Sequence, residues 1–133
     1  MSDSPELNSK LKLDVNDFKL GIATANREIR VLESGFRVTA AEMGDWTKTS
    51  EGLQARLKML TGVLNQQVDK VYATEREYKK LAKEKGANSV AAQEMLVKLN
   101  KEKESLTKVS KELDETDDRL RNFKKESKNA GKE

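Results

Sequence analysis

The sequence contains no cysteine and no histidine. Without cysteine the chain forms no disulfide and offers no thiolate to a metal, and without histidine it lacks the side chain that most often transfers protons near neutral pH. Carboxylates are the remaining candidates for chemistry, and the densest group is Asp114, Glu115, Asp117 and Asp118. On a helix these side chains spread around the surface and do not converge across a pocket, and they lack the glycine turn of a calcium loop. Glycine-rich phosphate-binding motifs are absent too. The sequence therefore predicts a protein that is not an enzyme and binds no metal or cofactor.

Proline and aromatic residues are also scarce. The chain has one proline, Pro5, and 5% aromatic residues, whereas 37% of its 133 residues are charged and 35% are hydrophobic. This is too little apolar surface for a compact globule, but it is typical of long helices that share a narrow apolar seam. The composition therefore predicts an elongated all-α protein.

Long apolar runs are missing as well. None approaches the roughly 20 residues that cross a bilayer, and the polar N-terminal residues are unlike a secretory signal. We therefore expect no membrane segment in this chain, and folding in the cytoplasm. The net charge is only +3, with basic and acidic residues mixed along the sequence. Because a nucleic-acid-binding protein gathers its basic residues on one face, direct nucleic-acid binding is not expected.

The N-terminal part of the chain divides into a leader and a helix. Residues 1–16 are expected to be flexible, with a short extended segment in which Leu11, Leu13 and Val15 alternate with polar residues. The first helix is predicted over residues 17–43. Its apolar residues are spaced by three and four and form one seam, made of Phe18, Ile22, Ala25, Ile29, Leu32 and Phe36.

A linker is predicted over residues 44–50, and it carries the only tryptophan, Trp46. Two interpretations are open for this side chain. The indole covers the end of the helical seam, or it is an exposed anchor for a partner. Thr49 or Ser50 is expected to cap the helix that follows.

The predicted core of the molecule is a coiled-coil helical hairpin over residues 51–125. Its turn lies at residues 86–89, because Gly86 can end a helix in a left-handed conformation and Asn88 or Ser89 can cap the next one. Heptad spacing gives the seam before the turn as Leu53, Leu57, Leu60 and Leu64, and after the turn as Leu99, Leu106, Leu113 and Leu120. Residues 126–133 have no periodicity and are expected to form a flexible tail.

Polar residues interrupt the seam of this hairpin at Gln67, Thr74 and Glu102. A polar seam residue lowers stability but fixes the register of the helices. The sequence does not choose between a closed three-helix arrangement, a dimer of hairpins and a continuous rod. We expect homo-oligomers that form through the Phe18–Phe36 seam, because the hairpin does not need that seam.

Several stretches resemble one protein family. They are Asp17-Phe18-Lys19-Leu20-Gly21-Ile22, Met43-Gly44-Asp45-Trp46-Thr47, the run from Ser50 to Lys58, and Gly86-Ala87-Asn88-Ser89-Val90-Ala91-Ala92-Gln93. In this order and at this separation they resemble the N-terminal region of tail tape measure proteins from long-tailed bacteriophages and prophages, over roughly residues 8–125.

The resemblance implies a structural role in phage tail assembly. Members of this family are long, mostly helical proteins that lie in the lumen of the tail tube and set its length. The implied partners are the tail tube protein and the tail assembly chaperones, and the implied locations are the host cytoplasm during assembly and then the virion tail. Family members run to many hundreds of residues, so we expect this chain to be a segment of a longer protein or the product of a truncated gene.

Two other functions fit a charged coiled coil. One is a generic coiled-coil adaptor or a chaperone-like module that holds client proteins at the tips of its helices. The other is a DNA-compacting coiled coil, against which the balanced charge argues.

Overall fold

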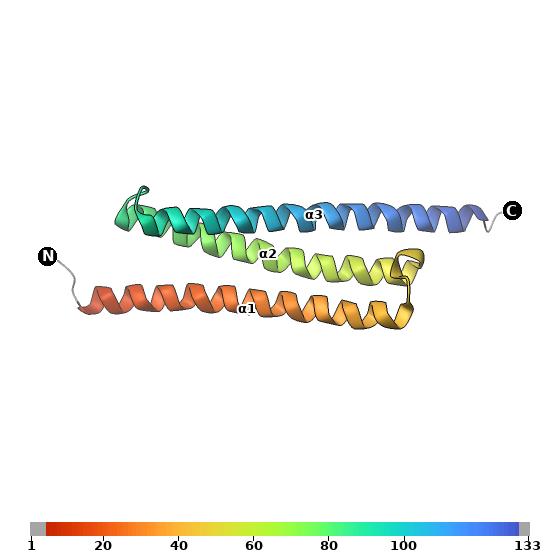
Figure 1. The fold of residues 1–133 in the computed structure, drawn as a ribbon, viewed down its shortest axis with the longest axis horizontal. Helices are drawn as coiled ribbons and strands as arrows, with labels where there is room; N and C mark the ends of the chain where they lie inside the picture. Colours follow the sequence, from red (N-terminus) through yellow and green to blue (C-terminus); the bar gives the residue numbers. More distant parts are fainter. Residues whose placement is uncertain (1–4, 131–133) are drawn as a thin grey trace.

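The computed structural model describes residues 5–130, and side chains within residues 16–129. This part of the chain contains the α-helices α1 (Pro5–Met43), α2 (Ser50–Lys85) and α3 (Val90–Ala130), the short 3-10 helix η1 (Trp46–Lys48), and no strand. The protein is therefore all-α, as predicted. Figure 1 shows three long helices side by side, with the chain reversing direction at η1 and again after α2.

Two predicted boundaries are wrong. The first helix begins at Pro5 and not at residue 17, so the described part of the leader is helical and the extended segment at residues 11–15 does not exist. Proline is tolerated in the first helical turn because its missing N–H has no partner there. Leu11, Val15 and Phe18 are also spaced by four and three, which continues the helical seam toward the N-terminus. Residues 1–4 lie outside the described part.

The last helix likewise runs beyond its predicted end at residue 125. It reaches Ala130, so residues 126–130 are helical, while 131–133 lie outside the described part. A helix that is already nucleated gains one hydrogen bond for each residue added, and a charged sequence without proline does not stop it. The basic side chain of Lys128 in the last turn also suits the negative end of the helix dipole.

Glycine ends two of the helices, and the sequence predicted this at Gly86. Gly44 and Gly86 have φ angles of 81° and 93°, in the left-handed region that favours glycine. The Gly44 N–H donates to the Ala40 carbonyl at 3.1 Å and the Gly86 N–H to the Ala82 carbonyl at 3.0 Å. At both reversals of the chain, the helix therefore ends at a glycine with a positive φ angle whose N–H bonds to the carbonyl four residues earlier.

Side-chain oxygens start the helices that follow. Thr49 Oγ1 accepts a hydrogen bond from the Gly52 N–H at 2.9 Å at the start of α2. Ser89 Oγ accepts from the Ala92 N–H at 3.2 Å and donates to the Gly86 carbonyl at 2.7 Å, which caps α3 and closes the turn. Asn88, the other predicted cap, lies exposed in the turn.

Helix α2 lies at the centre of the molecule and contacts both α1 and α3. In Figure 1, α2 runs beside α1 near η1 and diverges from it toward the Gly86 turn, where it lies against α3. The main apolar cluster lies near η1. It consists of Phe36, Met59, Leu60 and Val63, with partly buried residues packed around it, among them Ile29, Leu32, Trp46, Val109 and Leu113.

Candidate interaction surfaces

Arg56 is the centre of a contact that joins all three long helices near η1. Its guanidinium carbon lies 5.0 Å from the centre of the Phe36 ring on α1 and 5.2 Å from the centre of the Trp46 ring on η1. On its other side the guanidinium donates to Glu112 of α3, with the nitrogen 2.6 Å from the carboxylate oxygen. A guanidinium is suited to this position because it stacks on aromatic faces and pairs with a carboxylate at the same time.

Trp46 closes the same end of the core. Its ring meets Phe36 edge to face, with ring centres 5.3 Å apart and planes at 80°. The backbone of Trp46 lies so close to α2 that a Cβ on Gly52 would be 2.2 Å from the Trp46 carbonyl oxygen. The indole is half-buried and packs against the apolar cluster. The indole therefore covers the end of the helical seam, which was the first of the two interpretations, and is not an exposed anchor for a partner.

The predicted seam residues mostly lie inside the molecule. Buried members are Ile22, Phe36, Leu53, Leu60, Leu99 and Leu120. Half-buried members are Phe18, Ile29, Leu32, Leu57, Leu64, Leu106 and Leu113. The idea that the Phe18–Phe36 seam is left over for a second copy is therefore wrong, because Ile22 and Phe36 are already covered within one chain.

Polar side chains are buried farther along the helices. Gln67, Thr74, Glu77 and Glu102 are each at least nine-tenths buried. Gln67 Oε1, Thr74 Oγ1 and Glu102 Oε2 have no hydrogen-bond partner there. A buried polar atom without a partner lowers stability, so these positions weaken the packing. The sequence predicted polar seam positions at Gln67, Thr74 and Glu102, whereas nothing in its heptad pattern indicated that Glu77 is buried.

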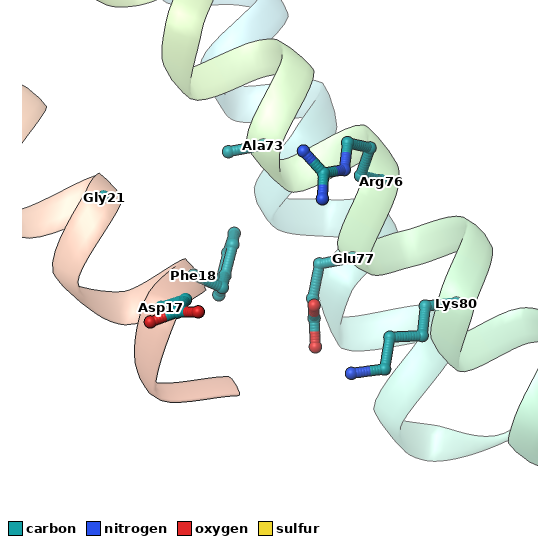
Figure 2. Close-up of a pocket in the computed structure, with 7 residues that line it drawn as sticks. All are labelled: Asp17, Phe18, Gly21, Ala73, Arg76, Glu77 and Lys80. Atoms are coloured by element: carbon teal, nitrogen blue, oxygen red, sulfur yellow. The ribbon is translucent and has the colours of Figure 1, made fainter. Parts of the chain in front are cut away.

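A cavity of about 280 Å³ lies between α1 and α2 in the same region. Figure 2 shows the Phe18 ring extending from α1 into this space, opposite Ala73 and Glu77 of α2. The amino group of Lys98 on α3 lies 5.3 Å from the centre of the Phe18 ring. Here α1 presents an aromatic side chain to a mostly polar face of α2, so its contact with the other helices is looser than at η1.

A second, more open cavity of about 460 Å³ lies beside the Arg56 contact. Its lining is polar and charged apart from one aromatic ring, and consists of Trp46, Arg56, Glu112, Glu115, Thr116, Asp118 and Arg119. Asp45 lies at the corner that η1 forms. Two hydrogen bonds to its carboxylate, from the hydroxyl and the backbone N–H of Thr47, hold the pKa of Asp45 below its usual value, with smaller contributions from Lys48 and Arg119.

The acidic group on α3 does not converge. Asp117 pairs with Arg121 at 3.1 Å on the helix surface, and Asp114, Glu115 and Asp118 are exposed. Among the described residues, no three acidic side chains are grouped so that they could hold a metal ion.

Sequence reasoning missed the pairing of Arg56 with Glu112. The two residues are 56 positions apart, and neither belongs to the heptad seam. No local signal could have paired them, because the contact depends on how the chain reverses at both ends of α2.

The chain matches no protein-family model, no curated protein and no solved structure. Over the residues that the structure describes, no helix is sufficiently long and apolar to cross a membrane.

Proposed function

We propose that this chain is a structural segment of a phage tail tape measure protein, which lies in the tail tube lumen and sets tail length. The observation that carries the proposal is its nearly unbroken helix. Between Pro5 and Ala130 the long helices stop only at the short stretches 44–49 and 86–89, and these stretches belong to the quoted resemblance. A length gauge needs a long regular backbone with a fixed rise per residue, and an α-helix provides about 1.5 Å per residue.

We further infer that α2 and α3 pack as a coiled-coil hairpin. Leu53, Leu60, Gln67 and Thr74 are buried at intervals of seven residues on α2, as are Ala92 and Leu99 on α3. This spacing is that of a coiled-coil seam. The same two helices form a hairpin when the chain reverses at Gly86, and a continuous rod when the helix runs straight through this position.

The surface fits a protein that slides past others without holding them tightly. Each of its long helices carries exposed residues of both charge signs, and the net charge of the chain is only +3. The proposed partners are the tail tube protein and the tail assembly chaperones, with assembly in the host cytoplasm and final placement in the virion tail.

Tail length gives the direct test. In virions that carry this segment within their tape measure, removing residues 90–130 in frame should shorten the tail by about 60 Å if α3 is extended along the tube, at about 1.5 Å per residue. Removing residues 50–130 should shorten it by about 120 Å if the helices form a rod, and by very little if they stay a hairpin. Unchanged tails in both deletions, with normal virion yield, would rule out the tape measure role.

A second candidate is a coiled-coil adaptor or chaperone-like binding module. The loose contact of α1 with α2 around Phe18 favours it, because a client helix needs an apolar face that can be uncovered. The test is suppression of aggregation of an unfolding client protein. Loss of suppression in Phe18→Ser, with suppression retained in the matched surface variant Val97→Ser, would support this function over the structural one.

A further inference from the structure

The outer surface of α1, directed away from the other helices, carries apolar residues in register. Leu20, Val31 and Val38 are 64%, 61% and 59% exposed. They are separated by eleven and seven residues, which correspond to about three and two turns of helix, so they lie on one line. We call this line and the residues beside it the α1 outer face. It is distinct from the Phe18–Phe36 seam, which packs inside the molecule.

Three basic residues border this line on one side, together with the exposed acidic residue Glu33, and a fourth basic residue, Arg27, lies on the line itself. Lys19, Arg30 and Arg37 each come directly before one of the three apolar residues, which places them about 100° around the helix. All three are exposed.

Acidic residues border the line on the other side. Glu28 precedes Val31 by three residues, and Glu42 follows Val38 by four. Asp17 has the same offset from Leu20, but it lines the cavity between α1 and α2 (Figure 2), so it does not belong to the α1 outer face. These offsets place the acidic residues about 40–60° around the helix in the direction opposite to the basic border.

None of these charges is neutralised within the chain. Between residues 16 and 43 the structure contains no ion pair, whereas the other helices pair charges four residues apart, as in Lys79–Glu75, Lys108–Glu104 and Arg121–Asp117. The charges of the α1 outer face therefore remain available to another molecule.

We infer that the α1 outer face binds the α1 outer face of a second copy of this chain, with the two helices parallel. When two parallel helices face each other across a two-fold axis, the basic border of each lies opposite the acidic border of the other. In an antiparallel pair, basic would meet basic and acidic would meet acidic.

The charges on the two sides of the apolar line also argue against a membrane surface as the partner of the α1 outer face. A helix that lies on an anionic membrane carries basic residues on both sides of its apolar line, and here one side is acidic. In a parallel pair, Arg27 on the line faces Arg27 of the second copy, and Ser34 adds no apolar surface. The pairing is therefore weak and appears only at high protein concentration. The inference does not depend on the tape measure role, since either could hold without the other.

Sedimentation over a wide range of concentration tests for the pair. The mass should rise from 15.0 kDa for one chain toward twice that value. Val31→Asn combined with Val38→Asn should raise the dissociation constant at least tenfold, because the replaced methyl groups are those that the pair buries. The matched control Val97→Asn replaces a valine of α3 that is 54% exposed and should leave the dissociation constant unchanged. A single chain at every concentration would overturn the inference and leave the face to a different protein.

Disulfide trapping tests the direction, and it is clean because the natural chain has no cysteine. Thr24→Cys and Ala41→Cys replace exposed residues near opposite ends of the line. A parallel pair should cross-link each variant with itself. An antiparallel pair would cross-link mainly mixtures of the two, and that result would overturn the inference.

Exchange of charge provides an independent check. Arg30→Glu with Arg37→Glu makes both borders acidic apart from Lys19, and Glu28→Lys with Glu42→Lys makes both basic apart from Glu33. Each double variant should remain a monomer by itself, and their equimolar mixture should associate. Self-association of both double variants at the wild-type concentration would show that the borders are not in contact.

Discussion

The two ends of the molecule are built differently. At the η1 end, Phe36, Met59, Leu60 and Val63 form a buried apolar cluster that Trp46 covers. At the Gly86 end, the buried side chains include Thr74, Glu77 and Glu102, and a cavity of about 280 Å³ separates Phe18 from α2. We call these the linker end and the turn end.

The difference shows how one helix pattern supports two kinds of packing. The seam of α1 is equally apolar along its whole length, but the residues of α2 that lie opposite it differ. They are Met59 and Val63 near the linker, and Ala73 and Glu77 near the turn. Apolar surface stabilises only when the opposite surface is also apolar. The linker end therefore holds α1 in place, and we expect α1 to separate from α2 at the turn end first.

Matched phenylalanine substitutions should produce the largest contrast between the ends. Phe36→Ala removes a buried ring from the apolar cluster and should lower the free energy of unfolding by about 3–5 kcal/mol. Phe18→Ala removes a half-buried ring beside a cavity and should lower it by about 1–2 kcal/mol. Urea denaturation followed by circular dichroism measures both. Equal losses would mean that the two ends are packed equally well.

Matched glycine substitutions should produce the next largest contrast, with opposite signs. A Cβ on Gly52 meets the Trp46 carbonyl oxygen at the linker end, so Gly52→Ala should lower the free energy of unfolding by about 1–3 kcal/mol through overpacking. At the turn end no atom lies within 4 Å of a Cβ on Gly21, so Gly21→Ala should raise it by up to about 1 kcal/mol through helix propensity.

The fluorescence of Trp46, the only tryptophan, reports whether the linker end moves. It should change in Gly52→Ala and stay the same in Gly21→Ala. If the free energy of unfolding rose in both Gly52→Ala and Gly21→Ala, η1 would not be tightly packed against α2.

The elements of this fold were largely predictable from the sequence. Residues spaced by three and four predicted the helices, and Gly86 predicted the end of α2, because helix periodicity and glycine caps are local properties. The first helix was predicted to start twelve residues late. A short alternation at Leu11, Leu13 and Val15 fits a strand and a helix equally well, and only the lack of a strand partner decides between them.

The candidate surfaces were less predictable, since they depend on which helix faces are covered. Heptad spacing identified the Phe18–Phe36 seam but not that α2 covers it within the same chain. Arg56 and Glu112 meet only after both reversals of the chain, and the exposed position of Leu20 follows from the same packing. Spacing assigns a residue to a face of a helix, whereas tertiary packing decides what lies against that face.

Matched threonine substitutions should produce a smaller contrast. Thr74 is fully buried and its hydroxyl has no partner, while Thr116 is nearly as buried and donates to the Glu112 carbonyl at 2.8 Å. Thr74→Val should raise the free energy of unfolding by about 1 kcal/mol, because it removes an unsatisfied polar atom and keeps the shape. Thr116→Val loses a hydrogen bond and should be neutral or destabilising by about 1 kcal/mol. Stabilisation in both would mean that buried hydroxyls are unfavourable at either end.

The smallest expected effect is a pH dependence confined to the linker end. The pKa of Asp45 lies below its ordinary value of 3.8 in the folded chain, first because the Thr47 hydroxyl and then because the Thr47 N–H donates to the carboxylate. A lowered folded pKa means that the charged carboxylate stabilises the fold above about pH 4, and that this contribution is lost as the pH falls through the folded pKa. Asp45→Asn should therefore lower stability slightly at neutral pH, and its difference from the natural chain should shrink below about pH 4. Thr47→Ala removes the larger of the two causes and keeps the N–H, so the pKa of Asp45, followed by NMR, should move part of the way back. If the pKa of Asp45 did not change in Thr47→Ala, the corner at η1 would not be held by this hydrogen bond, and the rigidity of the linker end would depend on Trp46 and Arg56 alone.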